Sequence, residues 1–252
     1  MAADFRLDGR CALVTGAARG LGQAMAVALA EAGADVTGVD VVDLGETQAH
    51  VEAAGRRFNA IERDLRGVEA TRRVVDDAAA AMGRLDILIN NAGIIRRADS
   101  IDFTETDWDD VIDLNLKSVF FLAQAAGRRF LAQGGGGKIV NVASMLSFQG
   151  GIRVPSYTAS KSGVLGLTRL LANEWAAKGI NVNAIAPGYM ATANTAPLRA
   201  DAARSAEILA RIPAGRWGEP VDLAGTVVFL CSAASGYVHG AVIPVDGGWL
   251  AR

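Results

Sequence analysis

The feature that most constrains the fold is the regular alternation of short, nearly continuous apolar runs with longer amphipathic stretches. The runs cover residues 11–16, 34–40, 86–93, 138–144, 180–188 and 241–248. Runs of this length are typical of parallel strands buried on both faces, and the stretches between them are typical of crossover helices. Helices are expected around residues 107–130, 157–178 and 221–232. The pattern predicts an α/β fold, a doubly wound parallel sheet in a three-layer α/β/α arrangement.

The length of the chain fits one such domain, which we expect to span residues 1–252. A chain of this size can bury roughly 70% of its unfolded surface in a single core. Residues 189–216 lack clear periodicity although they lie between two sheet elements. Because long insertions in compact domains are usually functional or disordered, we expect a partly helical flap near the ligand there.

The charge balance limits the kind of partner. A formal net charge of -2, from 25 basic and 27 acidic residues, leaves no basic surplus for nucleic acid or an anionic membrane. The N-terminus lacks the features of a signal peptide, and no apolar run reaches the roughly 18 to 20 residues of a membrane span. The sequence predicts a soluble protein with a small, locally charged ligand.

Cysteine and histidine are too scarce for several kinds of chemistry. Cys11 and Cys231 each lie inside an apolar run, which favours buried, reduced thiols and a cytoplasmic protein. With two histidines and two cysteines, a zinc site or a histidine-based triad is hard to assemble, so we expect no metal. The chemistry must use a cofactor, or side chains such as tyrosine, lysine and serine.

A glycine-rich turn follows the first apolar run. The stretch TGAARGLG carries Gly16, Gly20 and Gly22 and leads directly into a helical pattern. Glycines let the backbone approach a pyrophosphate, which the free N–H groups of a helix N-terminus bind. A plain strand-to-helix turn could carry the same residues, but Asp40 ends the next strand roughly 20 residues on, where a dinucleotide site needs an acid for the ribose.

Two acidic residues bear on how a dinucleotide would bind. The carboxylate of Asp40 would accept from a ribose 2'-hydroxyl and repel a 2'-phosphate, which favours NAD. Arg19 favours NADP instead, because a guanidinium in the loop could pair with the 2'-phosphate of that cofactor. Asp64, in ERDLRG, either accepts from the adenine amino group or caps the following helix.

Five motifs then carry a resemblance. TGAARGLG, NNAG at 90–93, Asn115 in DLNLKS, Ser144 in NVASMLS and Tyr157/Lys161 in YTASK resemble the pattern of the short-chain dehydrogenase/reductase family over nearly the whole chain. The resemblance implies a Rossmann-fold oxidoreductase with Asn115, Ser144, Tyr157 and Lys161 as its catalytic tetrad. The residues expected at the cofactor are Gly16, Arg19, Gly20, Leu21, Gly22, Asp40, Asp64, Leu65, Asn91, Ala92, Gly93, Tyr157, Lys161, Pro187, Gly188, Met190 and Thr192.

Elementary chemistry supports these catalytic roles. Tyr157 and Lys161 are four residues apart, so they share one helix face, and an ammonium there should lower the tyrosine pKa. Tyr157 could then act as general base or acid. Ser144, with Ser147 as a rival, would hold the substrate oxygen. Asn115 is an unfavourable residue in mid-helix unless its amide serves something, and the resemblance implies that it holds a water in a proton relay.

The substrate should meet the segments after NNAG and before Tyr157, and the flap. Candidates are Ser144, Arg96, Gln149, Arg153 and Trp217, since arginines can grip a carboxylate through two hydrogen bonds and an amide can read a hydroxyl. Arg97 is expected at the surface.

A narrower resemblance concerns the substrate. IIRR, SMLSFQGGIRVPSYTASKSG, NAIAPGYMAT, IPAGRWGEPVDL and VDGGWLAR resemble the branch of the family that acts on deoxy-keto sugar acids of the 2-dehydro-3-deoxy-D-gluconate or 2-deoxy-D-gluconate type. This branch belongs to the catabolism of pectin-type uronates, and related enzymes are mostly homotetramers. Gluconate 5-dehydrogenases and 3-oxoacyl-carrier-protein reductases share most of the motifs. A dinucleotide-binding regulatory protein is a non-enzymatic alternative, although an intact tetrad counts against it.

Overall fold

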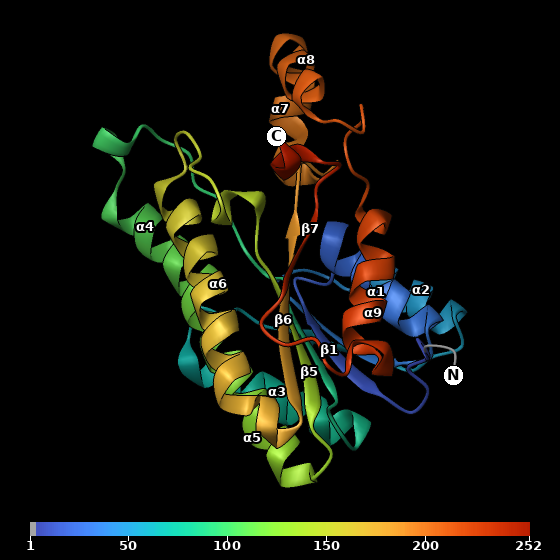
Figure 1. Ribbon diagram of the computed structural model, residues 1–252. Coiled ribbons are helices and arrows are strands. Elements are labelled where there is room, and N and C mark those ends of the chain that lie inside the picture. The colour runs from blue at the N-terminus through green and yellow to red at the C-terminus, as the bar shows by residue number, and fades with distance from the viewer. Residues whose placement is uncertain (1–3) are drawn as a thin grey trace.

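The computed structural model describes residues 4–252 and shows a parallel sheet between two layers of helices (Figure 1). Seven strands lie in the order β3-β2-β1-β4-β5-β6-β7, all parallel. They are β1 Cys11–Thr15, β2 Asp35–Asp40, β3 Phe58–Glu62, β4 Ile87–Asn90, β5 Gly137–Val142, β6 Ile180–Pro187 and β7 Val242–Val245. The order reverses between β1 and β4, and in such sheets ligands bind outside the carboxyl ends of the strands at this point.

Nine α-helices accompany the sheet within the described residues. They are α1 Gly20–Glu31, α2 Gly45–Ala53, α3 Val68–Met82, α4 Glu105–Ile112, α5 Ser118–Gln133, α6 Pro155–Trp175, α7 Ala196–Ala200, α8 Ala202–Arg211 and α9 Ala224–Cys231. Side chains of α1 and α9 pack with Val14 on one face of the sheet. Side chains of α3 and α5 pack with Leu13 on the other face. Successive residues of β1 therefore enter different cores, and both must be apolar.

Strand β3 was not among the six expected runs. Its sequence FNAIE alternates in character, and only Ile61 is buried. As an edge strand it has one paired neighbour and shows much of its surface, so it lacks the continuous apolar run that identifies the central strands.

The helix expected over 107–130 is interrupted. Helices α4 and α5 are joined by a π-helical turn, Asp113–Lys117, with the buried Asn115 at its centre. Such turns insert one extra residue into a helix and occur frequently at functional sites. The other two expected helices begin or end with tighter turns, Ala176–Lys178 after α6 and Pro220–Leu223 before α9.

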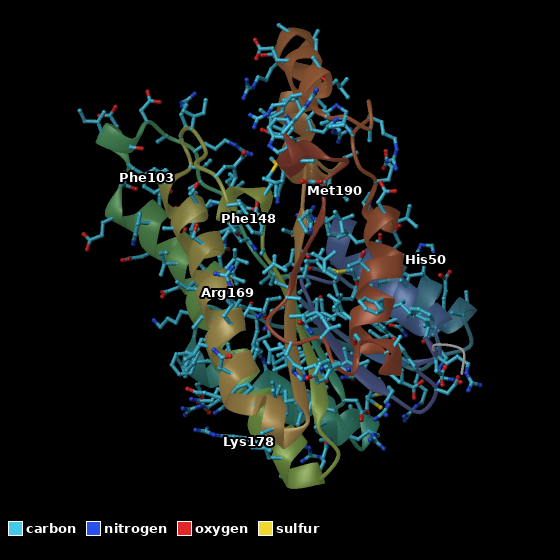
Figure 2. All side chains as sticks on the ribbon, viewed as in Figure 1. His50, Phe103, Phe148, Arg169, Lys178 and Met190 are labelled. Atoms are coloured by element: carbon cyan, nitrogen blue, oxygen red, sulfur yellow. The ribbon has the colours of Figure 1, made fainter. Side chains whose placement is uncertain are left out.

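Residues 189–216 contain the short helices α7 and α8, which project beyond the sheet (Figure 1). Their base is held by a small apolar cluster in which Met145, Ile208, Ile212 and Trp249 are buried. Figure 2 shows Met190 below these helices and Phe148 on the loop before α6. Within residues 4–252, no helix combines the length and apolar character needed to cross a bilayer.

Candidate active site

The glycine turn between β1 and α1 is shaped by close backbone contacts. Gly16 and Gly20 have φ of +66° and +61°, conformations that favour glycine. A Cβ on Gly22 would collide with the carbonyl oxygen of Gly16. The Asn91 amide donates to the carbonyls of Thr15 at 2.9 Å and Gly16 at 3.1 Å.

The N-terminus of α1 fits a phosphate group. This helix begins without a side-chain cap at Arg19, so its first N–H groups remain available to an anion. The turn and the helix end together fit a dinucleotide pyrophosphate. Leu21, in the same turn, packs against the core of that layer.

Asp40 lies beside this turn, as the spacing predicted. It ends β2, and its carboxylate accepts from the N–H of Ala18 at 3.0 Å and of Val41 at 2.7 Å. Arg19 is exposed at the start of α1. A ribose bound over the turn would therefore meet a carboxylate that the backbone already holds in place.

Asp64 follows β3 and is ion-paired rather than a helix cap. Its oxygens accept from Arg66 Nε at 3.2 and 2.9 Å, and Arg66 holds the pKa of this carboxyl below its usual value. The expected alternative, that Asp64 caps the next helix, is wrong because Gly67 is the N-cap of α3. Leu65 is buried.

The remaining predicted cofactor residues lie after β4 and β6. Ala92 N–H donates to the Thr15 hydroxyl at 3.1 Å, which joins the NNAG segment to β1. Asn90 donates to Asn141 at 2.9 Å and braces β4 against β5. After Pro187, Gly188 donates to the carbonyl of Val245 at 3.0 Å.

The start of the flap reaches the glycine turn. The Thr192 methyl lies 3.7 Å from the position of a Cβ on Gly20, and Met190 is buried. The flap therefore begins beside the turn that would hold the phosphates.

Tyr157 and Lys161 occupy α6, the lysine buried below the tyrosine. Lys161 Nζ lies 5.8 Å from the centre of the Tyr157 ring and donates to the carbonyl of Val142 at 2.6 Å. Burial lowers the pKa of Lys161 to about 8. The ammonium is thus held against β5, within one helical turn of the phenol.

The pKa of Tyr157 moves opposite to the expected direction. Burial raises the pKa of this phenol, while a hydrogen bond with Ser144 and the charge of Arg97 act against the rise. Our expectation that Lys161 would lower it is wrong for this structure, because desolvation dominates and the ammonium is directed to a main-chain carbonyl.

Ser144 and Ser147 have separate roles. Ser144 lies just beyond β5, where its hydroxyl accepts from the N–H of Leu146 at 3.1 Å and acts to lower the pKa of Tyr157. The Ser147 hydroxyl donates to the carbonyl of Lys161 at 2.7 Å and accepts from the N–H of Ser144 at 3.3 Å. Ser147 therefore fixes the loop to α6, and Ser144 is the serine beside the phenol.

The amide of Asn115 is engaged by the main chain. Its oxygen accepts from the N–H of Ile94 at 2.9 Å and its nitrogen donates to the carbonyl of Ile94 at 2.9 Å. A Cβ on Gly93 would lie only 3.1 Å from the same amide oxygen. The side chain braces the segment after β4, and the water-holding role that the resemblance implies stays a prediction.

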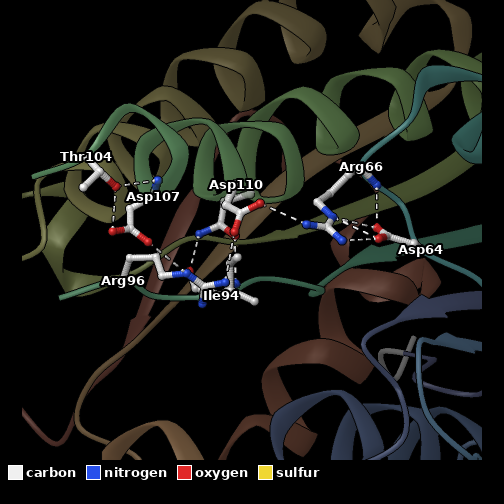
Figure 3. A network of polar contacts seen from close by, with 8 residues as sticks. Asp64, Arg66, Ile94, Arg96, Thr104, Asp107 and Asp110 are labelled. Carbon is white, nitrogen blue, oxygen red and sulfur yellow. Dashed lines mark hydrogen bonds and ion pairs between the residues drawn. The ribbon is translucent and has the colours of Figure 1, made fainter.

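Several predicted substrate residues are bound to other parts of the protein. Arg96 pairs with Asp107 and Asp110 of α4 (Figure 3). Arg153, with a left-handed φ of +63°, pairs with Asp99 at 2.9 Å. These contacts do not support the prediction that Arg96 and Arg153 are available to bind a substrate carboxylate.

The two other substrate candidates contact the flap region. Gln149 accepts from Arg211 of α8 at 3.3 Å. The rings of Trp217 and Tyr189 meet edge to face with 5.5 Å between their centres. Gln149 and Trp217 therefore contact the flap region, and a change in its conformation would change these contacts.

Arg97 affects the site although the sequence placed it only at the surface. It is exposed, as expected, yet its charge acts on Tyr157 and its guanidinium donates to the carbonyl of Asn194 in the flap at 3.1 Å. Arg96 is held by α4, whereas Arg97, the next residue, contacts the flap and its charge acts on the phenol. The two arginines of IIRR therefore have different partners.

Metal ligands do not gather anywhere in residues 4–252, where no three His, Cys, Asp or Glu side chains are placed to share an ion. The site as described combines a glycine turn at the N-terminus of α1, a carboxylate at the end of β2 and a tyrosine-serine-lysine group at the same edge of the sheet. This arrangement suits transfer of a hydride by a nicotinamide cofactor with proton transfer by the protein.

Known proteins of similar sequence match this chain over nearly its full length. Residues 16–250 match the family model described as enoyl-(acyl carrier protein) reductase. The chain is 64% identical over 248 residues, covering 98% of both chains, to the 2-dehydro-3-deoxy-D-gluconate 5-dehydrogenase of Escherichia coli strain K12.

Two solved structures extend the comparison. A crystal structure described as a 2-deoxy-D-gluconate 3-dehydrogenase from Agrobacterium tumefaciens with bound NADP is 60% identical, with a TM-score of 0.94 and 99% of both chains covered. One described as an NAD(P)-dependent gluconate 5-dehydrogenase from Beutenbergia cavernae, with NADP at low occupancy, is 50% identical with a TM-score of 0.94, covering 99% of this chain and 100% of that one.

The fold and the site define a nicotinamide-dependent oxidoreductase that acts on CH–OH groups. The chain belongs to the short-chain dehydrogenase/reductase family, which confirms the resemblance of its motifs. The NADP in both structures leaves the expected preference for NAD unconfirmed.

Proposed function

We propose that this protein transfers a hydride between NAD and a hydroxyl or keto carbon of a deoxy-keto sugar acid, of the 2-dehydro-3-deoxy-D-gluconate or 2-deoxy-D-gluconate type. The observation that carries the proposal is the grouping of Ser144, Tyr157 and Arg97: Ser147 ties the loop of Ser144 to Lys161 on α6 at 2.7 Å, and the charge of Arg97 acts on Tyr157. A sugar acid offers a hydroxyl for the first two and a carboxylate for the third. The names of the similar proteins support this substrate class.

Each side chain has a distinct task in this reaction. When bound, the nicotinamide supplies or accepts the hydride. Tyr157 moves the proton at the substrate oxygen, and Ser144 orients that oxygen by a hydrogen bond. Below pH about 8, Lys161 keeps its charge, and the carbonyl of Val142 holds its ammonium where it would bind the cofactor.

The preference for NAD rests on Asp40. We expect Asp40→Ala to raise the ratio of kcat/KM with NADP to that with NAD by roughly tenfold or more, because a like-charge repulsion against the 2'-phosphate is removed. Steady-state rates with both cofactors measure the ratio. Asp43→Ala is the matched control, since Asp43 lies on the loop just after β2 and accepts from the N–H of Gly45 at 3.1 Å. An unchanged ratio in Asp40→Ala would refute this assignment.

Arg97 is proposed to hold the substrate carboxylate. Arg97→Gln should raise KM for the sugar acid about ten- to a hundredfold, the value of a charge-assisted hydrogen bond, with a much smaller change in kcat. Arg204→Gln removes a comparable charge from the flap, where Arg204 pairs with Glu207, and should leave KM unchanged. Equal KM values for both variants and the parent would exclude Arg97 from substrate binding.

The test of the whole proposal is a panel of 2-dehydro-3-deoxy-D-gluconate, 2-deoxygluconate, gluconate and a 3-oxoacyl thioester, each with NAD and NADP. Turnover of the deoxy acids supports the proposal. Activity confined to the thioester with NADPH would instead identify an acyl-carrier-protein reductase, and no turnover at all would favour the regulatory alternative.

The same proposal extends to the setting of the enzyme. A role in the catabolism of pectin-type uronates follows from this substrate class, and the buried, free thiols of Cys11 and Cys231 agree with the cytoplasm. Leu131 on α5 and Leu170 on α6 are both nearly half exposed, which supports burial of these helices in a homotetramer.

A further inference from the structure

A chain of charged side chains runs along α4 and joins two loops of the site (Figure 3). Arg66 binds Asp64 on one side and Asp110 on the other. Arg96 binds Asp110 and Asp107, and Asp107 accepts from the Thr104 hydroxyl, which caps α4. No role in binding or catalysis described above uses Asp110.

Asp110 binds two arginines that lie on different loops of the site. Its Oδ1 accepts from Arg66 at 2.9 Å and its Oδ2 accepts from Arg96 at 3.0 Å. Its side chain is 26% exposed, less than Asp64 at 46% or Asp107 at 36%. Solitary surface ion pairs contribute little, but a shared, partly buried carboxylate fixes both partners at once.

The two arginines belong to different ends of the site. Arg66 holds Asp64, which lies where the adenine of a dinucleotide is expected. Arg96 lies two residues after Ile94, the residue braced by Asn115, and directly before Arg97, whose charge acts on Tyr157. Displacing Arg66 would therefore disturb the cofactor side of the site, and displacing Arg96 would disturb the substrate side.

We propose that Asp110 is a positioning residue that couples cofactor binding at Asp64 to the substrate-side segment 94–97. Arg66 is shared between two carboxylates. Without Arg96, Asp110 keeps a single counter-charge and draws Arg66 away from Asp64. Without Asp110, both arginines lose their common anchor on α4.

The first test needs no substrate, so it is independent of the proposed sugar-acid substrate. NADH binding is titrated by nucleotide fluorescence in Arg96→Gln, Asp110→Asn and the double variant. Arg96→Gln should raise the Kd for NADH about two- to tenfold although Arg96 lies on the substrate side, and should add nothing once Asp110→Asn is present. An unchanged Kd in Arg96→Gln overturns the proposal.

The second test measures the opposite direction and rests on the proposed function. Arg66→Gln should raise KM for the sugar acid about two- to tenfold with little change in kcat, and Asp110→Glu should restore part of what Asp110→Asn loses. Glu69→Gln breaks the surface pair with Arg73 at 2.9 Å and should change neither constant. An effect of Arg66→Gln confined to NADH would overturn the coupling, whereas no turnover by the parent enzyme would refute only the proposed function.

Discussion

Replacement of Tyr157 by phenylalanine is expected to lower kcat by about 10²- to 10⁴-fold, the usual contribution of a positioned acid or base. The change removes one oxygen from the group that moves the proton, and nothing in the structure can replace it. Ser144 remains, but an alcohol is far too weakly acidic to act alone at neutral pH. Steady-state turnover with the best acid of the panel measures the loss.

Binding of NADH should survive this change with a nearly unaltered Kd, because the glycine turn, Asp40 and Lys161 keep their contacts. Tyr237→Phe is the matched control, since Tyr237 is 99% exposed and the same atom is removed. Full activity in Tyr157→Phe would eliminate the mechanism. Loss of both turnover and NADH binding would point to a structural role for the phenol instead.

The parts of the fold that the sequence predicted are those in which local pattern and burial agree. The central strands are apolar on both sides because Leu13 and Val14 enter different cores. Strand β3 was not predicted because Ile61 is its only buried residue. The π turn at Asn115 was not predicted for another reason. The Asn115 amide is bound to Ile94, and helical periodicity does not encode a contact between such distant segments.

The features of the site also divide into those that the sequence predicted and those that it did not. The glycine turn and the Tyr157–Lys161 pair depend on short spacings along the sequence, so the sequence was enough to predict that these residues lie together. Arginine partners depend on tertiary structure: Arg96 pairs with α4, whereas Arg97 contacts the flap and its charge acts on the phenol. The direction of the Tyr157 pKa was missed because helical spacing places a charge nearby but does not measure desolvation.

The Gly22→Ala variant is expected to lose both stability and cofactor affinity, because its new methyl has no place to go. The ideal Cβ would overlap the carbonyl oxygen of Gly16 and lie 2.5 Å from the amide nitrogen of Asn91. The oxygen is backbone and cannot rotate away, so α1 must move or the turn must open. Overpacking of this kind costs about 1–3 kcal/mol.

Opening the turn would also break the hydrogen bonds from Asn91 to Thr15 and Gly16 and move the N-terminus of α1 away from the phosphates. We therefore expect the thermal midpoint to fall by roughly 2–4 °C for each kcal/mol lost and the Kd for NADH to rise at least about tenfold. Differential scanning fluorimetry and NADH titration give the two values.

Gly225→Ala is the matched control, since Gly225 is an exposed residue of α9 whose Cβ would meet nothing within 4 Å. It should leave NADH binding unchanged and stabilise the helix by up to about 1 kcal/mol. A Gly22→Ala protein that binds NADH as tightly as the parent would mean that the turn yields without moving α1, and the phosphate site would then have to be sought elsewhere on the sheet edge.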